Sequence, residues 1–137
     1  MKSRSESLIR LKKFQVDEKR RQVTQIEMMI ADFERMASEL DQQIEIEQQK
    51  TGISDVAHFA YSTFAKAAIA RRDNLLASAH DMKEKLEAAQ DALAEAVEDL
   101  KKVELLDQRE HNREQAEQNK AEQAEFDEIA RYRHMRS

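Results

Sequence analysis

Two pairs of side chains in this sequence have the types and the spacing of metal ligands. His58 follows Asp55 by three residues, and Glu84 follows His80 by four. On a helix, either spacing places both side chains on one face, where an imidazole nitrogen and a carboxylate oxygen can share a metal ion. Metal sites between helices need such pairs from several facing helices, with the carboxylates pointing inward. The inward positions derived below are mainly Ala, Leu, Ile and Val, so we expect neither a metal site nor a cofactor.

Other catalytic chemistry finds little support in the composition. The 137 residues include a single Gly and no Cys, which excludes a Gly-rich phosphate loop and a thiolate metal site. Two paired helices also lack the concave pocket in which a nucleophile and a base are set. We therefore expect a protein that is not an enzyme, with no catalytic residues and no small-molecule substrate.

Long helices are the structure that the composition favours. Charged residues make up 37% of the chain, aromatic residues make up 5%, and Pro and Trp are absent. Few residues can therefore interrupt a helix, and few can fill a thick core. The N-terminal region has no apolar segment of the signal-peptide kind, and no stretch approaches the ~20 apolar residues that span a bilayer. Together with the absence of Cys, these features predict an all-α protein in the cytoplasm.

A seven-residue repeat of apolar side chains runs through the first third of the chain. The residues of this repeat, here called position a, are Ile9, Val16, Val23, Ile30, Ala37 and Ile44. At position d, three residues later, the chain carries Lys12, Lys19, Ile26, Phe33, Leu40 and Glu47. An apolar seam of this kind is typical of a coiled coil. It predicts a first helix over about residues 4–50.

The repeat lapses around Gly52, the only Gly of the chain. Gly commonly ends a helix, because it accepts the left-handed backbone conformation without a steric penalty. Ser54 and Asp55 are of the types that cap the start of a helical turn. We therefore expect a turn with a short helical segment over about residues 51–62, followed by a second helix over about residues 63–110.

The second helix carries an apolar seam of its own. Its d positions are Leu75, Met82, Ala89, Ala96 and Val103, and its a positions are Ala79, Leu86, Leu93 and Leu100. The seam ends at Leu106, because Asp107 and further acidic residues occupy the seam positions beyond it. We expect no pairing with the first helix after that point.

The two seams fit each other if the chain folds back on itself. The seven-residue register passes through the break unchanged, so one continuous helix in a parallel dimer would show the same pattern. Antiparallel pairing, however, sets large side chains against small ones, such as Val23 against Ala89, and both seams then end together at Leu8 and Leu106. The sequence thus predicts an all-α fold: one domain over residues 1–137, a long antiparallel two-helix coiled-coil hairpin with a C-terminal helical overhang. Each arm would be roughly 60 Å long.

The overhang is a charged extension over residues 111–137 that is either helical or frayed. Opposite charges at helical spacing would stabilise it by only ~0.2–0.5 kcal/mol per pair. Phe126, Ile129 and Tyr132 fall on one helix face with no intramolecular partner in reach. They predict either a docking stripe or, since chain ends are commonly disordered, a frayed tail.

A basic run lies near the start of the first helix. It consists of Lys12, Lys13, Lys19, Arg20 and Arg21. Asp17 and Glu18 interrupt it, no aromatic residues of a nucleic-acid interface accompany it, and the chain carries a net charge of −5. We therefore expect no nucleic-acid partner. The run is either a solvated helix face or a surface that meets acidic loops of a protein.

Apolar and aromatic residues gather at the turn. They are Ile53, Val56, Phe59, Tyr61, Phe64 and Ile69. These side chains either close the end of the hairpin or form a surface for a partner, to which Tyr and Phe would supply contact area at a low entropic cost.

Four segments of the sequence resemble a known family. They are LIRLKKFQVDEKRR at Leu8–Arg21, the following Val23–Ile30, the turn TGISDVAHFAYSTFAKA at residues 51–67, and LKKVELLDQRE at residues 100–110. Together they resemble the FliJ-type component of the bacterial flagellar type III export apparatus, in its alphaproteobacterial form. The resemblance implies an antiparallel two-helix coiled coil similar to the central stalk of rotary ATPases.

The resemblance also implies partners and a location. Such a stalk would bind the ring of the flagellar export ATPase and the membrane protein of the export gate, and would help to cycle export chaperones. It would lie in the cytoplasm, peripheral to the inner face of the cell membrane at the flagellar base, and would support substrate secretion, flagellum assembly and motility.

Each implied partner has candidate residues. The ATPase would be met by the free ends of the hairpin, which are the segment around Leu8–Arg21 with its basic run and the stretch after Leu100. The gate would be met by Tyr61, Phe64, Ile69 and Leu76. The alternative function is a cytoplasmic coiled-coil scaffold or tether that self-associates through residues 107–137.

Overall fold

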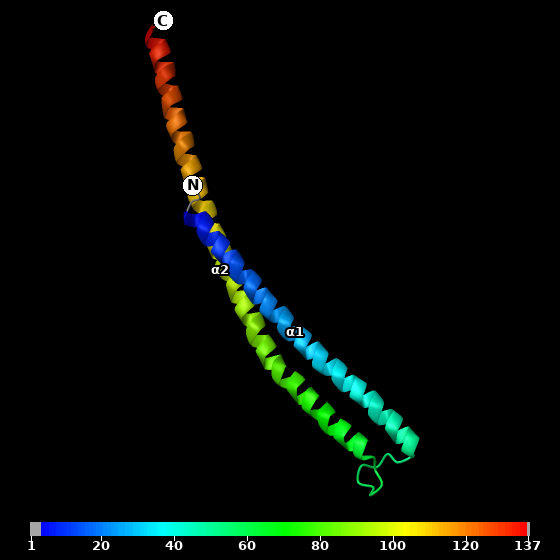
Figure 1. Ribbon diagram of the computed structural model, residues 1–137. Helices are drawn as coiled ribbons and strands as arrows, with labels where there is room; N and C mark the ends of the chain where they lie inside the picture. The colour runs from blue at the N-terminus through cyan, green and yellow to red at the C-terminus, as the bar shows by residue number, and fades with distance from the viewer. Residues whose placement is uncertain (1–3, 137) are drawn as a thin grey trace. The chain divides into compact units, whose positions relative to one another are not determined.

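The computed structural model describes residues 4–136, which form two long helices. Helix α1 spans Arg4–Thr51 and helix α2 spans Thr63–Arg136, with no strand in the described part of the chain. In Figure 1 the end of α1 and the start of α2 lie side by side and are joined by residues 52–62. The predicted all-α helical hairpin is confirmed.

Contacts divide the chain into two compact units. One consists of residues 16–95 and contains the turn, so it is called the turn unit below. The other consists of residues 1–15 with residues 96–137, and it is called the terminal unit. Where the sequence predicts one domain, the contacts separate two units, each with its own part of the seam.

Position a of α1 forms the core of the turn unit. Val16, Val23, Ile30, Ala37 and Ile44 are the buried residues of the helix. All the d residues of α1 in this unit, from Lys19 to Glu47, are half-buried. Because a and d share one face of a helix, this burial is what the predicted apolar seam requires.

The facing seam of α2 starts earlier than the sequence analysis places it. Ala65 and Ala68 are buried, with Ala65 at 0% exposure, and they precede Leu75 and Ala79 by one or two seven-residue steps. The short side chain of Ala lets two helices approach closely, which explains why an Ala pair follows the turn directly. Arg72 interrupts the repeat, and this interruption hides the start of the seam in the sequence.

Both helix ends at the turn are closed by specific groups. Gly52 has a φ of 71°, as predicted for the residue after a helix, and its N–H donates to the carbonyl of Gln48 at 2.9 Å. Ser62 caps α2: its Oγ accepts a hydrogen bond from the N–H of Ala65 at 3.2 Å and donates one to Glu47 at 3.0 Å. The Ser62 hydroxyl therefore caps one helix and ties it to the other.

The turn itself contains no helical segment, contrary to the sequence prediction. Two successive tight turns replace it, with hydrogen bonds from the N–H of His58 to the carbonyl of Asp55 and from the N–H of Tyr61 to the carbonyl of His58, both at 3.0 Å. The Asp55 carboxylate accepts the N–H of Ala57, and His58 Nδ1 accepts the N–H of Ala60. Side chains that bind nearby backbone N–H groups compete with helix formation, which is the physical reason for the difference.

In the terminal unit the seam residues are less buried than in the turn unit, and the two helices flank each other further than predicted. Ile9, Leu100 and Val103 are only half-buried, while Leu106 is 61% exposed. A hollow of about 430 Å³ nevertheless continues between the two helices past Leu106. Its lining residues are Arg4, Ser5, Glu6, Leu8, Asp107, Glu110, His111 and Glu114. The helices therefore flank each other for about two turns more than the apolar pattern indicates, here with a polar lining.

Beyond this hollow α2 continues as a helix to Arg136, with every residue from 108 to 136 exposed. The extension predicted as helical or frayed is helical throughout its described part. The orange and red end of α2 in Figure 1 shows this segment.

Candidate partner-binding surfaces

The side chains that could have bound a metal ion lie apart from one another or serve the backbone. Asp55 and His58 hold the two tight turns described above, while His80 and Glu84 are both exposed on α2. Residues 4–136 contain no group of three or more His, Cys, Asp or Glu side chains placed to hold a metal ion. No helix in this range has the length and apolar character needed to cross a membrane.

The residues of the basic run differ in burial and are divided between the two units. Lys12 in the terminal unit and Lys19 in the turn unit occupy seam position d and are half-buried. Neither amine has an ion pair within residues 4–136. Their aliphatic stems cover the seam while the amines reach solvent, so the seam near these lysines is sealed less well than by Leu or Ile.

The other basic side chains face away from the seam. Lys13 is exposed in the terminal unit. In the turn unit, Arg20 lies 3.6 Å from Asp17, and Arg21 pairs with Glu18. These exposed i,i+3 pairs contribute little to stability, so the arginines are able to exchange their local partners for those of another protein.

Apolar side chains are exposed in the two segments of the terminal unit that the resemblance assigns to the ATPase, although the sequence reasoning did not single them out as exposed. On α1 they are Leu8, Leu11 and Phe14, and on α2 they are Leu105 and Leu106. Leu11 and Phe14 belong to neither position a nor position d, so their departure from the seam repeat was the available signal. Apolar residues gathered on the outside of a thin helical unit indicate a protein contact.

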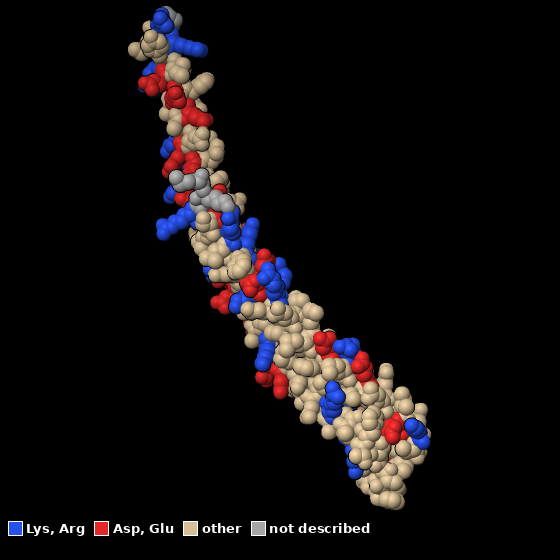
Figure 2. Space-filling view, in the orientation of Figure 1, with Lys and Arg blue, Asp and Glu red and all other residues tan. Residues whose placement is uncertain are grey.

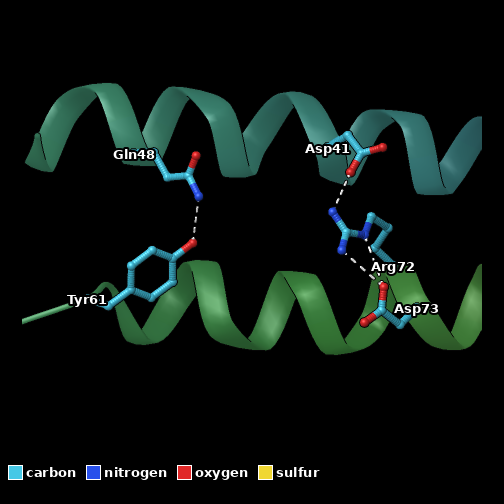
Figure 3. Close-up of polar contacts among 5 residues, drawn as sticks. All are labelled: Asp41, Gln48, Tyr61, Arg72 and Asp73. Atoms are coloured by element: carbon cyan, nitrogen blue, oxygen red, sulfur yellow. Dashed lines mark hydrogen bonds and ion pairs between the residues drawn. The ribbon is translucent and has the colours of Figure 1, made fainter. Parts of the chain in front are cut away.

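Tyr61, one of the residues that the resemblance assigns to the gate, lies in the interior of the turn unit and not on its surface. The side chain is 5% exposed, and its hydroxyl accepts a hydrogen bond from Gln48 Nε2 at 2.9 Å (Figure 3). Its ring covers the end of the seam, and its hydroxyl is satisfied by α1. Of the two interpretations open for Tyr61, closing the hairpin is the one that its position favours.

The other predicted gate residues do reach the surface of the turn unit. Phe64 and Leu76 are exposed, and Ile69 is half-buried. Ile69 and Leu76 are seven residues apart, so they lie on one face of α2. Figure 2 shows that uncharged residues cover most of this part of the visible face.

The turn adds a more prominent apolar group. Phe59 is 96% exposed, and its ring stacks on His58 with centroids 4.7 Å apart and an interplanar angle of 23°. Val56 is also exposed. A fully exposed Phe, held on a turn whose backbone is fixed by hydrogen bonds, has the properties of a contact residue.

A charged group stands within the seam of the turn unit. Arg72 Nη1 donates to Asp41 Oδ1 on the other helix at 2.8 Å, and its Nε and Nη2 donate to Asp73 at 3.2 and 3.1 Å (Figure 3). The hydrogen bond to Asp41 is the main cause that raises the pKa of Arg72 above its ordinary value, and the bond to Asp73 adds to it. Arg72 is therefore a fixed positive charge that joins the helices where the apolar repeat would place a Leu.

The three residues for which the sequence predicts either a docking stripe or a frayed tail lie on the helical end of α2. Phe126, Ile129 and Tyr132 are exposed, and Met135 extends the exposed apolar set. Arg136 lies over the ring of Tyr132, with Cζ 5.7 Å from the ring centroid. Despite this contact, all four apolar side chains are at least 50% exposed.

Comparison with known proteins places the chain in a family. No curated protein and no solved structure matches it. The family model of the flagellar FliJ proteins matches over residues 1–137. The residues that suggested this resemblance, the helical hairpin and the family match agree, and the chain therefore belongs to the FliJ family of components of the flagellar export apparatus.

Proposed function

We propose that this chain is a non-enzymatic stalk and adaptor of the flagellar type III export apparatus. It binds the ring of the export ATPase through the terminal unit and the basic run, and it binds the export gate through the turn unit. It also contacts export chaperones. It works in the cytoplasm, peripheral to the inner face of the cell membrane at the flagellar base. The observation that carries the proposal is the family match over the whole chain.

The ATPase contact is supported by the thin seam of the terminal unit. Lys12 is half-buried there without an ion pair in the described chain, and Leu11 and Phe14 are exposed. A surface with apolar side chains and unpaired lysines can bury the former and meet acidic loops with the latter. Lys13, Lys19, Arg20 and Arg21 complete the proposed ATPase-binding set.

The gate contact is supported by the apolar surface of the turn unit. Phe64, Ile69 and Leu76 remain the proposed contact residues, and we add the exposed Phe59. Tyr61 supports this surface from inside, because its hydrogen bond to Gln48 holds the end of α1 near the start of α2.

Hydrolysis by the cognate export ATPase tests the first half of the proposal. The purified chain should stimulate ATP hydrolysis, and Lys12→Glu with Lys13→Glu should weaken binding roughly tenfold, which is ~1.4 kcal/mol. Lys85→Glu is the matched control, because Lys85 is an exposed lysine on α2 outside the proposed surface. If the chain neither binds nor stimulates the ATPase, the stalk function is rejected and the scaffold function remains.

A further inference from the structure

The tail of α2 carries a pattern that mirrors itself about Ile129. Phe126 and Tyr132 lie three residues before and after this residue. Charged side chains lie four and seven residues to either side: Glu125 and Glu122 before it, Arg133 and Arg136 after it. The pattern is thus symmetric in position and opposite in sign of charge.

All seven side chains lie on one face of the helix. Offsets of three, four and seven residues fall close to whole turns of an α-helix, and residues 122–136 are helical and exposed. This face is not a continuation of the hairpin seam, because the seven-residue steps from Leu100 and Val103 do not reach Ile129. Its residues are exposed, so α1 does not cover it.

Contacts within the chain leave the charges of this face available. Glu125 and Arg133 have no ion pair within residues 4–136. Glu122 accepts one long hydrogen bond from Gln118, at 3.4 Å, and Arg136 lies over Tyr132. None of these contacts neutralises the acidic half of the face or its basic half.

We propose that this face pairs with the same face of a second copy of the chain, antiparallel, about a two-fold axis at Ile129. In that arrangement a residue k positions after Ile129 lies opposite the residue k positions before it in the other copy. Ile129 then meets itself, Phe126 meets Tyr132, and Glu125 and Glu122 meet Arg133 and Arg136. Two-fold symmetry doubles each contact, which gives four interchain ion pairs around an apolar and aromatic centre.

The charges select this orientation and this occupant. A parallel pair would set Glu122 against Glu122 and Arg136 against Arg136, which places like charges together. A partner of one charge sign would suit only one half of the face. A second copy in the antiparallel direction complements both halves at once, with side chains that the sequence already contains.

Charge exchange tests the pairing on the full chain. By sedimentation equilibrium, the natural chain should form dimers, and Arg133→Glu with Arg136→Glu should raise the dimer dissociation constant by about tenfold or more. Glu122→Arg with Glu125→Arg should raise the dimer dissociation constant by a similar factor. An equimolar mixture of the two variants should dimerise again, and so should a chain that carries all four substitutions.

Cysteine cross-linking tests the geometry independently, because the chain has no Cys of its own. Ile129→Cys should form a disulfide between copies, whereas Glu122→Cys should not, since its two copies would lie roughly 21 Å apart along the axis. Glu122→Cys should instead cross-link to Arg136→Cys. Circular dichroism of each variant identifies any loss of the tail helix.

Three outcomes overturn the pairing. They are a chain that stays monomeric at every concentration, variant mixtures that do not dimerise although their tails are helical, and Glu122→Cys that cross-links to itself. Protection of Ile129→Cys by the export ATPase in a chain that remains monomeric would assign the face to the ATPase instead. ATPase stimulation can fail or succeed independently of all three outcomes, so the two proposals are separable.

Discussion

At the scale of single residues, side chains of the turn that could bind a metal ion or a partner form hydrogen bonds within the chain instead. Asp55 and His58 have the spacing of metal ligands, yet both accept hydrogen bonds from backbone N–H groups two residues further along the chain. Tyr61 is of a residue type that is common in protein contacts, but its side chain is buried against α1. In both cases a group that could bind a metal or a partner is used within the chain: Asp55 and His58 bind the local backbone, and Tyr61 binds the side chain of Gln48.

The bond between Tyr61 and Gln48 predicts a graded loss of stability. Tyr61→Phe keeps the ring in the seam and removes the hydroxyl, so it should lower the free energy of unfolding by ~0.5–1.5 kcal/mol. Tyr61→Ala also removes the ring and should cost about 3 kcal/mol. Urea unfolding followed by circular dichroism measures both. Equal losses for the two variants would mean that the ring does not close the seam.

The contact between Arg72 and Asp41 predicts a measurable coupling between the two helices. Both side chains are partly exposed, so a double-mutant cycle with Arg72→Ala and Asp41→Ala should give a coupling energy of only ~0.5–1 kcal/mol. Because the pKa of Arg72 is raised on folding, its contribution is fully present below the pKa of the unfolded chain. It is lost only as the pH rises through the higher folded value.

The pH range therefore gives a second check on this pair. The arginine contribution should not change between about pH 6 and pH 9, since an arginine stays charged throughout that range. Arg72→Leu serves as the comparison variant: it restores the apolar repeat and should be neutral or stabilising, whereas Arg72→Ala should be destabilising. A coupling energy of zero would make the contact incidental.

At the scale of the elements, α1 and α2 have seams of unequal quality along their length. In the turn unit, five position-a residues of α1 are buried against α2. In the terminal unit the seam residues are at most half-buried, and the helices next flank a polar-lined hollow. The weaker seam is the part that supplies the surface proposed for the ATPase, because side chains not committed to the core remain available.

The lysines at seam positions predict that the hairpin can be made more stable. Lys19→Leu would place an apolar side chain at a half-buried d position and should raise the free energy of unfolding by ~0.5–1 kcal/mol. Lys85→Leu, at an exposed position of α2, is the matched control and should leave stability unchanged within ~0.5 kcal/mol. The midpoint of urea unfolding measures both. The same gain from both variants would show that Lys19 is not at the seam.

At the scale of the whole molecule, the two units carry surfaces of different character. The turn unit presents Phe59, Phe64 and Leu76 on and beside a turn fixed by hydrogen bonds. The terminal unit presents Leu11, Phe14 and Leu105 around a thin seam. An adaptor that binds two partners requires surfaces of this kind that do not overlap.

Because the two proposed surfaces consist of different residues, we expect that gate binding and ATPase binding can be removed one at a time. Phe64→Ala with Leu76→Ala should weaken binding to the cytoplasmic part of the export gate by roughly tenfold or more and leave ATPase stimulation unchanged. Phe14→Ala with Leu105→Ala should instead weaken ATPase stimulation and leave binding to the export gate unchanged. Binding titrations and hydrolysis rates on the same preparations measure both. Loss of both activities in either double variant would contradict separate surfaces.

The sequence by itself determined the helices, the seam and the family. Seven-residue spacing fixes which face of a helix is apolar, and for two helices joined by one turn that face can be buried only against the other helix. Val16 to Ile44 could therefore be assigned to the core without coordinates. The single Gly marked the end of α1, because no other residue type accepts its backbone conformation as readily.

Only the tertiary structure decided how the ends of the seam are used. Burial of Tyr61 and the tight turns in place of a helical segment depend on individual hydrogen bonds that follow no periodic pattern. The early start of the α2 seam at Ala65 depends on the close approach of the helices that the small Ala side chain allows. The exposure of Leu11 and Phe14 likewise depends on what lies beside them. Periodicity reports which residues share a face, whereas the contacts made at a turn or a helix end follow from individual donors, acceptors and side-chain sizes.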